Sequence, residues 1–107
     1  MPNAYFLVRA VVPPALRDEF DHWYATDHLP LALRTFQCEK AWRFWSTIEP
    51  NVHYAFYRFA DMAKLDRAMK SDGLKAMIAD FDRAFPTITR TRDILDLIDE
   101  RDGISTP

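Results

Sequence analysis

The sequence predicts an α+β domain in which strands and helices follow the order β-α-β-β-α-β. Four stretches are rich in β-branched and aromatic residues, which is typical of strands. Two other stretches carry apolar residues at helical spacing. With 107 residues, of which 49% are hydrophobic, the chain is long enough to bury one core. We expect a single domain over residues 1–99, followed by a flexible tail over residues 100–107.

The first predicted strand covers residues 4–12, with the sequence AYFLVRAVV. Apolar residues occupy both of its alternating faces, so we expect it to be buried on both sides. The two prolines that follow end the strand and suit the first turn of a helix. Leu16, Phe20 and Trp23 then recur at i, i+4 and i+7, which predicts a helix with one apolar stripe.

A helix break is predicted directly after this stripe. Thr26 and Asp27 are good N-cap residues, and Pro30 suits the first turn of a new helix. We therefore expect a second, short helix that runs to about Thr35. In this arrangement His28 would lie at a helix N-terminus, where the partial positive charge of the backbone N–H groups favours the neutral imidazole.

The middle of the chain predicts a hairpin and then a second helical region. Residues 39–47 and 52–59 each carry large apolar side chains on both faces and are separated by a Pro-Asn turn. Asp61 is a suitable N-cap for the helix that follows. Residues 71–73, Ser-Asp-Gly, interrupt this helix, and Pro86 ends it. Residues 87–97 are rich in Thr and Ile and predict the fourth strand.

This order of elements normally gives a four-stranded antiparallel sheet with the helices on one face, the ferredoxin-like arrangement. The other face of the sheet would then be uncovered. Since the first three strands carry large apolar side chains on both faces, we expect that face to pack against a second copy of the chain. The sequence therefore predicts a homodimer.

Composition excludes several classes of protein. The net charge is −2 with no block of Lys or Arg, which argues against nucleic acid and anionic membranes as partners. One cysteine permits neither an internal disulfide nor a cysteine-based metal site. The sequence shows no signal peptide and no membrane span, so we expect a cytoplasmic protein. Glycine-rich phosphate-binding motifs are also absent.

The segment over residues 20–33, FDHWYATDHLPLAL, has the highest density of functional side chains. His28 could act as a general base or acid. Asp27 could orient His28 or simply cap the helix, and Tyr24 could hold a substrate oxygen or be a structural residue of the core. We predict His28, Tyr24 and Asp27 as the candidate catalytic residues.

The spacing Trp23-Tyr24-x-x-Asp27-His28-x-Pro30 resembles the W-Y-x-x-[DE]-H-x-P segment of EthD-like proteins in the dimeric α/β-barrel superfamily. The resemblance implies that two sheets pair into a barrel across a dimer interface, with a small-molecule pocket in each subunit. The superfamily includes lactone isomerases, polyketide cyclases, cofactor-independent monooxygenases and haem-handling enzymes. One departure concerns the loop into the second strand, where Phe36-Gln37 stands in place of a Pro-Gly turn.

Residues expected to contact the substrate come from the helix and from the first two strands: Trp23, Arg9, Trp42 and Arg43. Arg9 could instead pair with an acid such as Asp27 or Glu39, because a buried guanidinium needs an acceptor. We expect no metal site, because the three histidines lack helical ligand spacing and His53 is expected at the surface. We also expect no cofactor, and haem is disfavoured because residues 61–85 contain no histidine.

These expectations together favour an enzyme of the EthD-like type that transfers a proton on a hydrophobic or aromatic compound, as an isomerase or cyclase does. Two alternatives stay open at this point. One is a cofactor-independent monooxygenase that uses the same pocket. The other is a non-catalytic, dimeric module that binds a metabolite.

Overall fold

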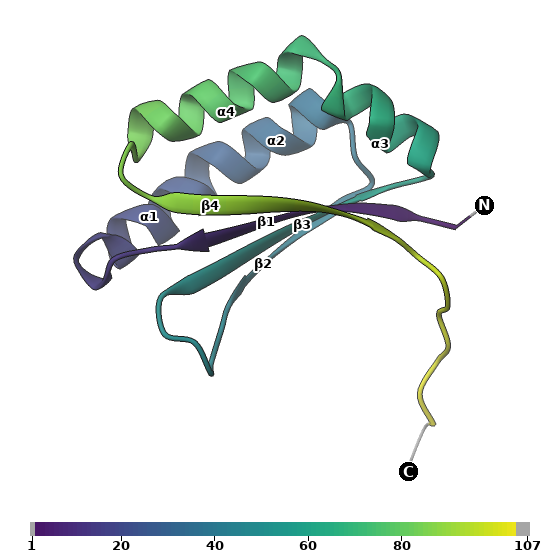
Figure 1. Ribbon diagram of the computed structural model, residues 1–107, viewed down its shortest axis with the longest axis horizontal. Helices are drawn as coiled ribbons and strands as arrows, with labels where there is room; N and C mark the ends of the chain where they lie inside the picture. The colour runs from purple at the N-terminus through teal and green to yellow at the C-terminus, as the bar shows by residue number, and fades with distance from the viewer. Residues whose placement is uncertain (1, 105–107) are drawn as a thin grey trace.

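The computed structural model describes residues 2–104, and in this range the chain forms one four-stranded antiparallel sheet with all helices on one face (Figure 1). The strands lie in the order β2-β3-β1-β4. They are β1 (Ala4–Val11), β2 (Lys40–Trp45), β3 (Val52–Phe59) and β4 (Thr89–Asp96). The helical elements are η1 (Pro14–Leu16), α1 (Arg17–Trp23), η2 (Tyr24–His28), α2 (Leu29–Phe36), α3 (Met62–Met69) and α4 (Asp72–Ala84). The predicted α+β, ferredoxin-like order is therefore confirmed.

The two faces of the sheet follow from the alternation of side chains along β1. Phe6, Val8 and Ala10 are buried and point toward the helices, whereas the residues between them point to the other face. The register extends this division across the sheet, since Val8 lies opposite Ala55 on β3 and opposite Arg92 on β4. The even-numbered residues of β4 thus face the helices.

The face without helices carries an apolar patch. Tyr5, Trp42, Phe44 and Phe56 line a shallow hollow there, and 49% of Phe44 is exposed to solvent. After β4 the chain turns away on the uncovered side of the sheet (Figure 1). The apolar side chains of β1, β2 and β3 thus lie on both faces of the sheet, and the residues of β1 on the face without helices are half-buried or exposed in the single chain, so burial of both its faces stays a prediction.

The predicted break at residues 26–27 is wrong, because α1, η2 and α2 form one continuous helical run. The wide π-helical turn η2 joins the two α-helices without a side-chain cap. Thr26 donates its hydroxyl hydrogen bond back to the His22 carbonyl (2.8 Å), and Asp27 is exposed. His28 therefore lies inside the helical run and not at a helix N-terminus. Sequence cannot easily show this, because Pro30 fits both the expected and the observed arrangement.

The π-helical turn has a direct effect on which side chains face the sheet. Five buried residues are spaced four apart along this helical run: Phe20, Tyr24, His28, Ala32 and Phe36. In a regular α-helix a stripe with this spacing drifts by about 40° at each step, so its ends would point away from each other. A π-helical turn holds more residues than an α-helical turn and reverses this drift. The insertion therefore keeps all five side chains on the sheet.

The remaining helices begin and end close to the predicted positions. Asp61 caps α3 by accepting a hydrogen bond from the Lys64 N–H (2.8 Å), and Ser71 caps α4 in the same way through Leu74 (3.3 Å). The loop that lacks a Pro-Gly turn closes through Gln37, whose φ of 53° is left-handed. A non-glycine side chain thus takes the place where glycine is common.

The strand predictions differ from the structure by at most two residues at their ends. Of the expected tail, residues 100–104 have no regular structure and are exposed, while residues 105–107 lie outside the described residues. Within residues 2–104, none of the helices is long and apolar enough to cross a membrane.

Candidate functional site

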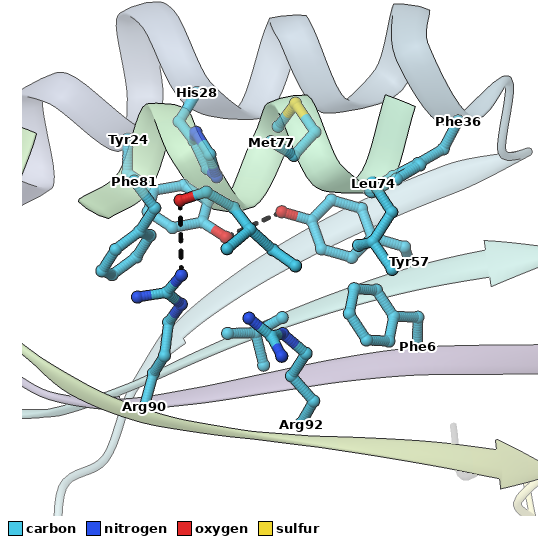
Figure 2. Close-up of a pocket in the computed structure, with 12 residues that line it drawn as sticks. Phe6, Tyr24, His28, Phe36, Tyr57, Leu74, Met77, Phe81, Arg90 and Arg92 are labelled. Carbon is cyan, nitrogen blue, oxygen red and sulfur yellow. Dashed lines mark hydrogen bonds between the residues drawn. The ribbon is translucent and has the colours of Figure 1, made fainter. Parts of the chain in front are cut away.

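A pocket lies between the sheet and the helices α2 and α4, with a volume of about 350 Å³ including its open mouth (Figure 2). Its walls are mostly aromatic and aliphatic. The lining residues are Phe6, Val8, Tyr24, His28, Phe36, Tyr57, Leu74, Met77, Ile78, Phe81, Arg90 and Arg92. The five polar members of this set are two phenols, one imidazole and two guanidinium groups. The pocket therefore combines an apolar wall with a few polar groups, as small-molecule sites do.

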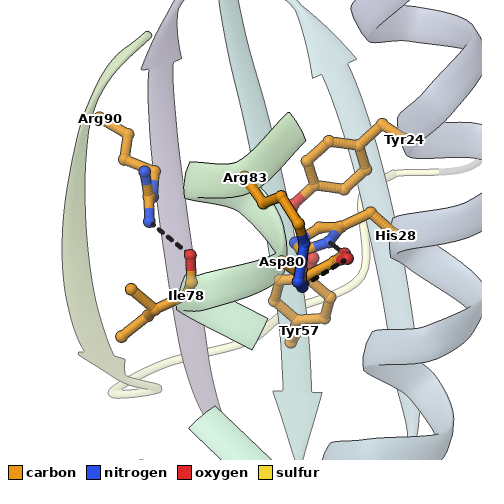
Figure 3. A network of polar contacts seen from close by, with 7 residues as sticks. All are labelled: Tyr24, His28, Tyr57, Ile78, Asp80, Arg83 and Arg90. Carbon is orange, nitrogen blue, oxygen red and sulfur yellow. Dashed lines mark hydrogen bonds and ion pairs between the residues drawn. The ribbon is translucent and has the colours of Figure 1, made fainter. Parts of the chain in front are cut away.

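His28 is held in the pocket wall by a carboxylate from α4. Its Nδ1 atom lies 3.0 Å from Oδ2 of Asp80, whose other oxygen lies 3.8 Å from the Arg83 guanidinium (Figure 3). Because a carboxylate accepts and does not donate hydrogen bonds, Nδ1 carries the proton of the neutral ring. Nε2 is then an unprotonated acceptor, and it has no hydrogen-bond partner among residues 2–104.

The surroundings of His28 favour the neutral ring. Its side chain is buried, stacks on Trp23 with ring centroids 4.5 Å apart, and contacts the edge of Phe81. Burial lowers the pKa of His28, while the hydrogen bond to Asp80 raises it and only partly compensates. The histidine is thus base-competent at neutral pH. The direction of this pKa shift agrees with the sequence prediction, but burial causes it, and the helix N-terminus assumed there does not exist.

Two phenols form the floor of the pocket next to His28. The hydroxyl oxygens of Tyr24 and Tyr57 lie 2.7 Å apart, and the Tyr24 ring is 4.9 Å from the His28 ring (Figure 2). Burial raises the pKa of Tyr24 to about 12 and raises that of Tyr57 well above its usual value. Both groups are therefore protonated at neutral pH. Since one hydroxyl donates to the other, the pair still has one O–H available for a ligand oxygen.

Two arginines rise from the edge strand β4 into the pocket mouth (Figure 2). Arg90 is held by Oδ1 of Asp82 at 2.7 Å and donates to the Ile78 carbonyl at 3.5 Å. Arg92 stands two residues further along the same face and is exposed to solvent. Neither residue was predicted as a site residue, because the sequence places both in an ordinary strand.

A second polar network lies behind the aromatic wall, between α1 and the β2–β3 hairpin. Arg43 donates to Asp21 (2.6 Å) and to Nε2 of His53 (3.1 Å), and Trp45 donates to the same Asp21 oxygen (2.8 Å). The hydrogen bonds from Trp45 and Arg43 lower the pKa of Asp21. The guanidinium of Arg43 also lies 5.2 Å from the centre of the Tyr24 ring. Arg43 thus supports the phenol pair from outside the pocket.

The structure brings together only part of the predicted site. His28 and Tyr24 line the pocket, and Trp23 stacks on the outer face of His28. Asp27 is exposed and is not among the partners of His28, so Asp80 orients the ring in its place. Sequence reasoning missed Asp80, which is 52 residues away in the chain and resembles any other acid of an amphipathic helix.

The predicted contacts from the strands lie elsewhere. Arg9 and Trp42 are on the sheet face that carries no helices, and Arg9 pairs with Glu49 at 2.9 Å. Arg43 belongs to the network behind the pocket wall. The expectation that His53 is at the surface is wrong, because only 1% of it is exposed. In residues 2–104, no three His, Cys, Asp or Glu side chains gather closely enough to hold a metal ion.

Comparison with known proteins gives likeness in structure only. No family model and no curated protein sequence matches the chain. An ethyl tert-butyl ether D (EthD) family protein from Bacillus halodurans is similar with a TM-score of 0.62 and 20% identity, over 84% of this chain and 96% of that one. The cofactor-independent oxygenase SnoaB from Streptomyces nogalater is similar with a TM-score of 0.67 and 15% identity, over 99% and 100%.

A dimeric ferredoxin-like protein from an uncultured marine organism is also similar, with a TM-score of 0.63 and 13% identity over 94% of this chain and 100% of that one. At these identities the likeness concerns the fold alone. The ferredoxin-like fold of the single chain is thereby confirmed, while the pairing of two sheets into a barrel stays a prediction. The chain has the ferredoxin-like fold and shares it with these three solved structures.

Proposed function

We propose that the pocket is the active site of a small-molecule enzyme that transfers a proton on a hydrophobic or aromatic compound, in the manner of an isomerase or cyclase. The observation that carries this proposal is the geometry of His28. Its Nδ1 is fixed by Asp80, its Nε2 has no hydrogen-bond partner among residues 2–104, and its ring lies beside two protonated phenols. A base, an orienting acid and an oxygen-binding donor are the parts that such a reaction needs.

The reaction begins with removal of a proton from a carbon next to a carbonyl group. Nε2 of His28 takes this proton, so the C–H bond breaks, an N–H bond forms, and the electron pair moves to the carbonyl oxygen. The free O–H of the Tyr24–Tyr57 pair donates to that oxygen as its charge develops. The imidazolium then returns the proton to a different carbon, which completes the isomerisation and restores neutral His28. A base placed in this way contributes a rate factor of about 10²–10⁴.

The walls of the pocket limit what can enter it. The enclosed space of the pocket is about 30 Å³, and the figure of about 350 Å³ includes the open mouth, so a ligand larger than a few atoms extends into that mouth. Aromatic rings of Phe6, Phe36 and Phe81 line the interior, and they favour flat, unsaturated ligands through ring contacts. Flat, unsaturated cyclic compounds that extend out into the open mouth are therefore the expected substrates.

Proton abstraction can be tested without knowing the natural substrate. The protein is incubated in heavy water with a panel of cyclic β-diketones, unsaturated lactones and hydroxynaphthalenes, and hydrogen exchange at carbon is followed by NMR. We expect catalysed exchange for at least one compound and its loss in His28→Gln. His22→Gln is the matched control, because His22 is exposed on α1 and is not among the pocket residues. Saturable binding without exchange would instead identify a non-catalytic metabolite-binding module.

A cofactor-independent monooxygenase is the second candidate, and the likeness to SnoaB favours it. The same proton abstraction at His28 would give a carbanion that is oxidised by dioxygen, with one oxygen atom entering the product and the other leaving as water. Reaction under isotopically labelled dioxygen separates the two candidates. Label in the product would establish the oxygenase, whereas rearrangement at the same rate under argon would establish the isomerase.

We also propose that the chain is a homodimer that pairs through the uncovered sheet face. The support is the apolar hollow formed by Tyr5, Trp42, Phe44 and Phe56, together with the likeness to a protein described as dimeric. Light scattering at micromolar concentration should give the mass of two chains. Phe56→Lys places a charge in the centre of the face and should give monomers, whereas Lys64→Glu on α3 should leave the mass unchanged. A wild-type monomer would overturn the proposal.

A further inference from the structure

The mouth of the pocket is positively charged. Arg90 and Arg92 are two residues apart on β4 and face the helices, so their backbones are separated by about 6.6 Å. The residues that line the pocket include no carboxylate. A ligand that enters here therefore passes two guanidinium groups before it reaches the aromatic interior.

The two arginines differ in whether their charge is already compensated. Arg90 is paired with Asp82, donates to the Ile78 carbonyl, and lies 4.0 Å from the centre of the Phe81 ring. Only 11% of its side chain is exposed. Arg90 is thus fixed in place as part of the pocket wall, and its binding capacity is used by the protein itself.

Arg92 has no such partners. Within the described part of the chain it makes no side-chain hydrogen bond and no ion pair, although it lines the pocket next to Phe6. Burial and the neighbouring charge of Arg90 lower its pKa, and the charge of Asp82 only partly opposes them. A planar guanidinium without a partner at the mouth of an apolar pocket is suited to hold a carboxylate through two parallel hydrogen bonds.

We propose that the substrate carries a carboxylate and that Arg92 holds this group at the pocket mouth. The inference rests on the proposed function of the same pocket and adds the substrate class: an aromatic or cyclic unsaturated carboxylic acid. Arg92 fixes the anionic end at the solvent side, and the ring extends inward between Phe6 and Phe81. The reacting carbon then lies in the interior, toward Nε2 of His28 and the Tyr24–Tyr57 pair.

The test compares one ring system with and without its charge. Isothermal titration calorimetry measures the binding of hydroxynaphthoate and of its uncharged methyl ester to the wild-type protein and to variants. We expect the acid to bind about tenfold to hundredfold more tightly than the ester, as is usual for a charge-assisted hydrogen-bonded pair. Arg92→Gln should remove this preference and leave ester binding unchanged, while Arg92→Lys should keep part of it.

Arg67→Gln is the matched control, because Arg67 is exposed on α3 and the substitution changes the net charge equally. Since Arg92 has no partner in residues 2–104, Arg92→Gln should also keep the wild-type melting temperature. Equal binding of acid and ester by the wild type, or an unchanged preference in Arg92→Gln, would overturn the carboxylate assignment alone. Failure of both compounds to bind would overturn it together with the proposed aromatic pocket.

Discussion

Mild acid should destabilise this fold through His53. The ring is 1% exposed and lies 5.1 Å from Phe20 and 4.8 Å from Tyr24, measured between ring centres. Its Nε2 accepts a hydrogen bond from Arg43, so a proton at that position would meet a guanidinium instead of an acceptor. Burial, followed by the charge of Arg43, lowers the pKa of His53 to about 3.

The size of the effect follows from the two states of His53. In the unfolded chain its pKa is about 6.5, so the unfolded state gains a proton as the pH falls below that value while the folded state stays neutral. Protonation therefore favours unfolding, and stability is lost as the pH decreases. Between pH 7 and pH 5 the loss is about 2 kcal/mol, and it reaches about 4 kcal/mol near pH 3.

Urea denaturation at pH 7 and at pH 5 measures this difference, with the protein concentration held constant so that association contributes equally. His53→Gln removes the titrating ring, and its amide oxygen can still accept from Arg43. We expect the variant to lose most of the pH dependence, with a smaller remainder of the same sign from His28, whose pKa is also lowered. His22→Gln serves as the control on the exposed surface. A variant as sensitive to acid as the wild type would refute the reasoning.

Three further predictions concern the site and its frame. Asp80→Asn should lower turnover about 10²–10⁴-fold, because the amide can stabilise the wrong tautomer of His28. Since the hydrogen bond to Asp80 raises the pKa of His28, the variant should also move the acid limb of the pH–rate profile to lower pH. Structural damage alone would not give this shift. Tyr57→Phe should cost about 1–2 kcal/mol in urea denaturation, since it leaves the buried Tyr24 hydroxyl without its partner; no loss would mean that another group satisfies it. Gln37→Gly should stabilise the fold by about 1 kcal/mol in thermal denaturation, because its φ of 53° favours glycine; a lower melting temperature would contradict this.

The strands could be predicted well because their signal is local. Runs of aromatic and β-branched side chains over residues 4–11 and 52–59 identify both strands. The N-caps at Asp61 and Ser71 accept hydrogen bonds from residues only three positions away, so this signal is local as well. Fold class therefore followed from short-range patterns.

The site was only partly predictable because its partners are distant in the chain. His28 and Tyr24 could be nominated from their own segment, but the carboxylate that orients His28 comes from α4 and the cations at the mouth come from β4. Which acid of α4 faces α2 depends on how the two helices rotate against each other. Nothing in the sequence marks Arg92 as a site residue, because it lies in an exposed strand that contains three other charged residues.

The helical run also showed where a local pattern can mislead. Thr26, Asp27 and Pro30 have the chemistry of a helix start, yet the chain passes through them without a break. The π-helical turn is favoured by tertiary packing, since it brings His28 and Phe36 onto the sheet together. The preference of Thr26 and Asp27 for a helix start was therefore outweighed by the burial of side chains on the opposite side of the helix.

Because the η2 turn already holds one extra residue, the fold can tolerate a change of one residue in the length of this segment. Deleting one residue between Tyr24 and His28 would close the wide turn into ordinary α-helix and preserve its helical character. A π-helical turn uses one more residue than an α-helical turn for nearly the same rotation, so the two halves of the helical run would keep their orientation to the sheet. A change of one codon could thus alter the side chains of the turn itself while the sheet and the rest of the run stay in place, so related chains could vary the pocket wall through insertion or deletion here.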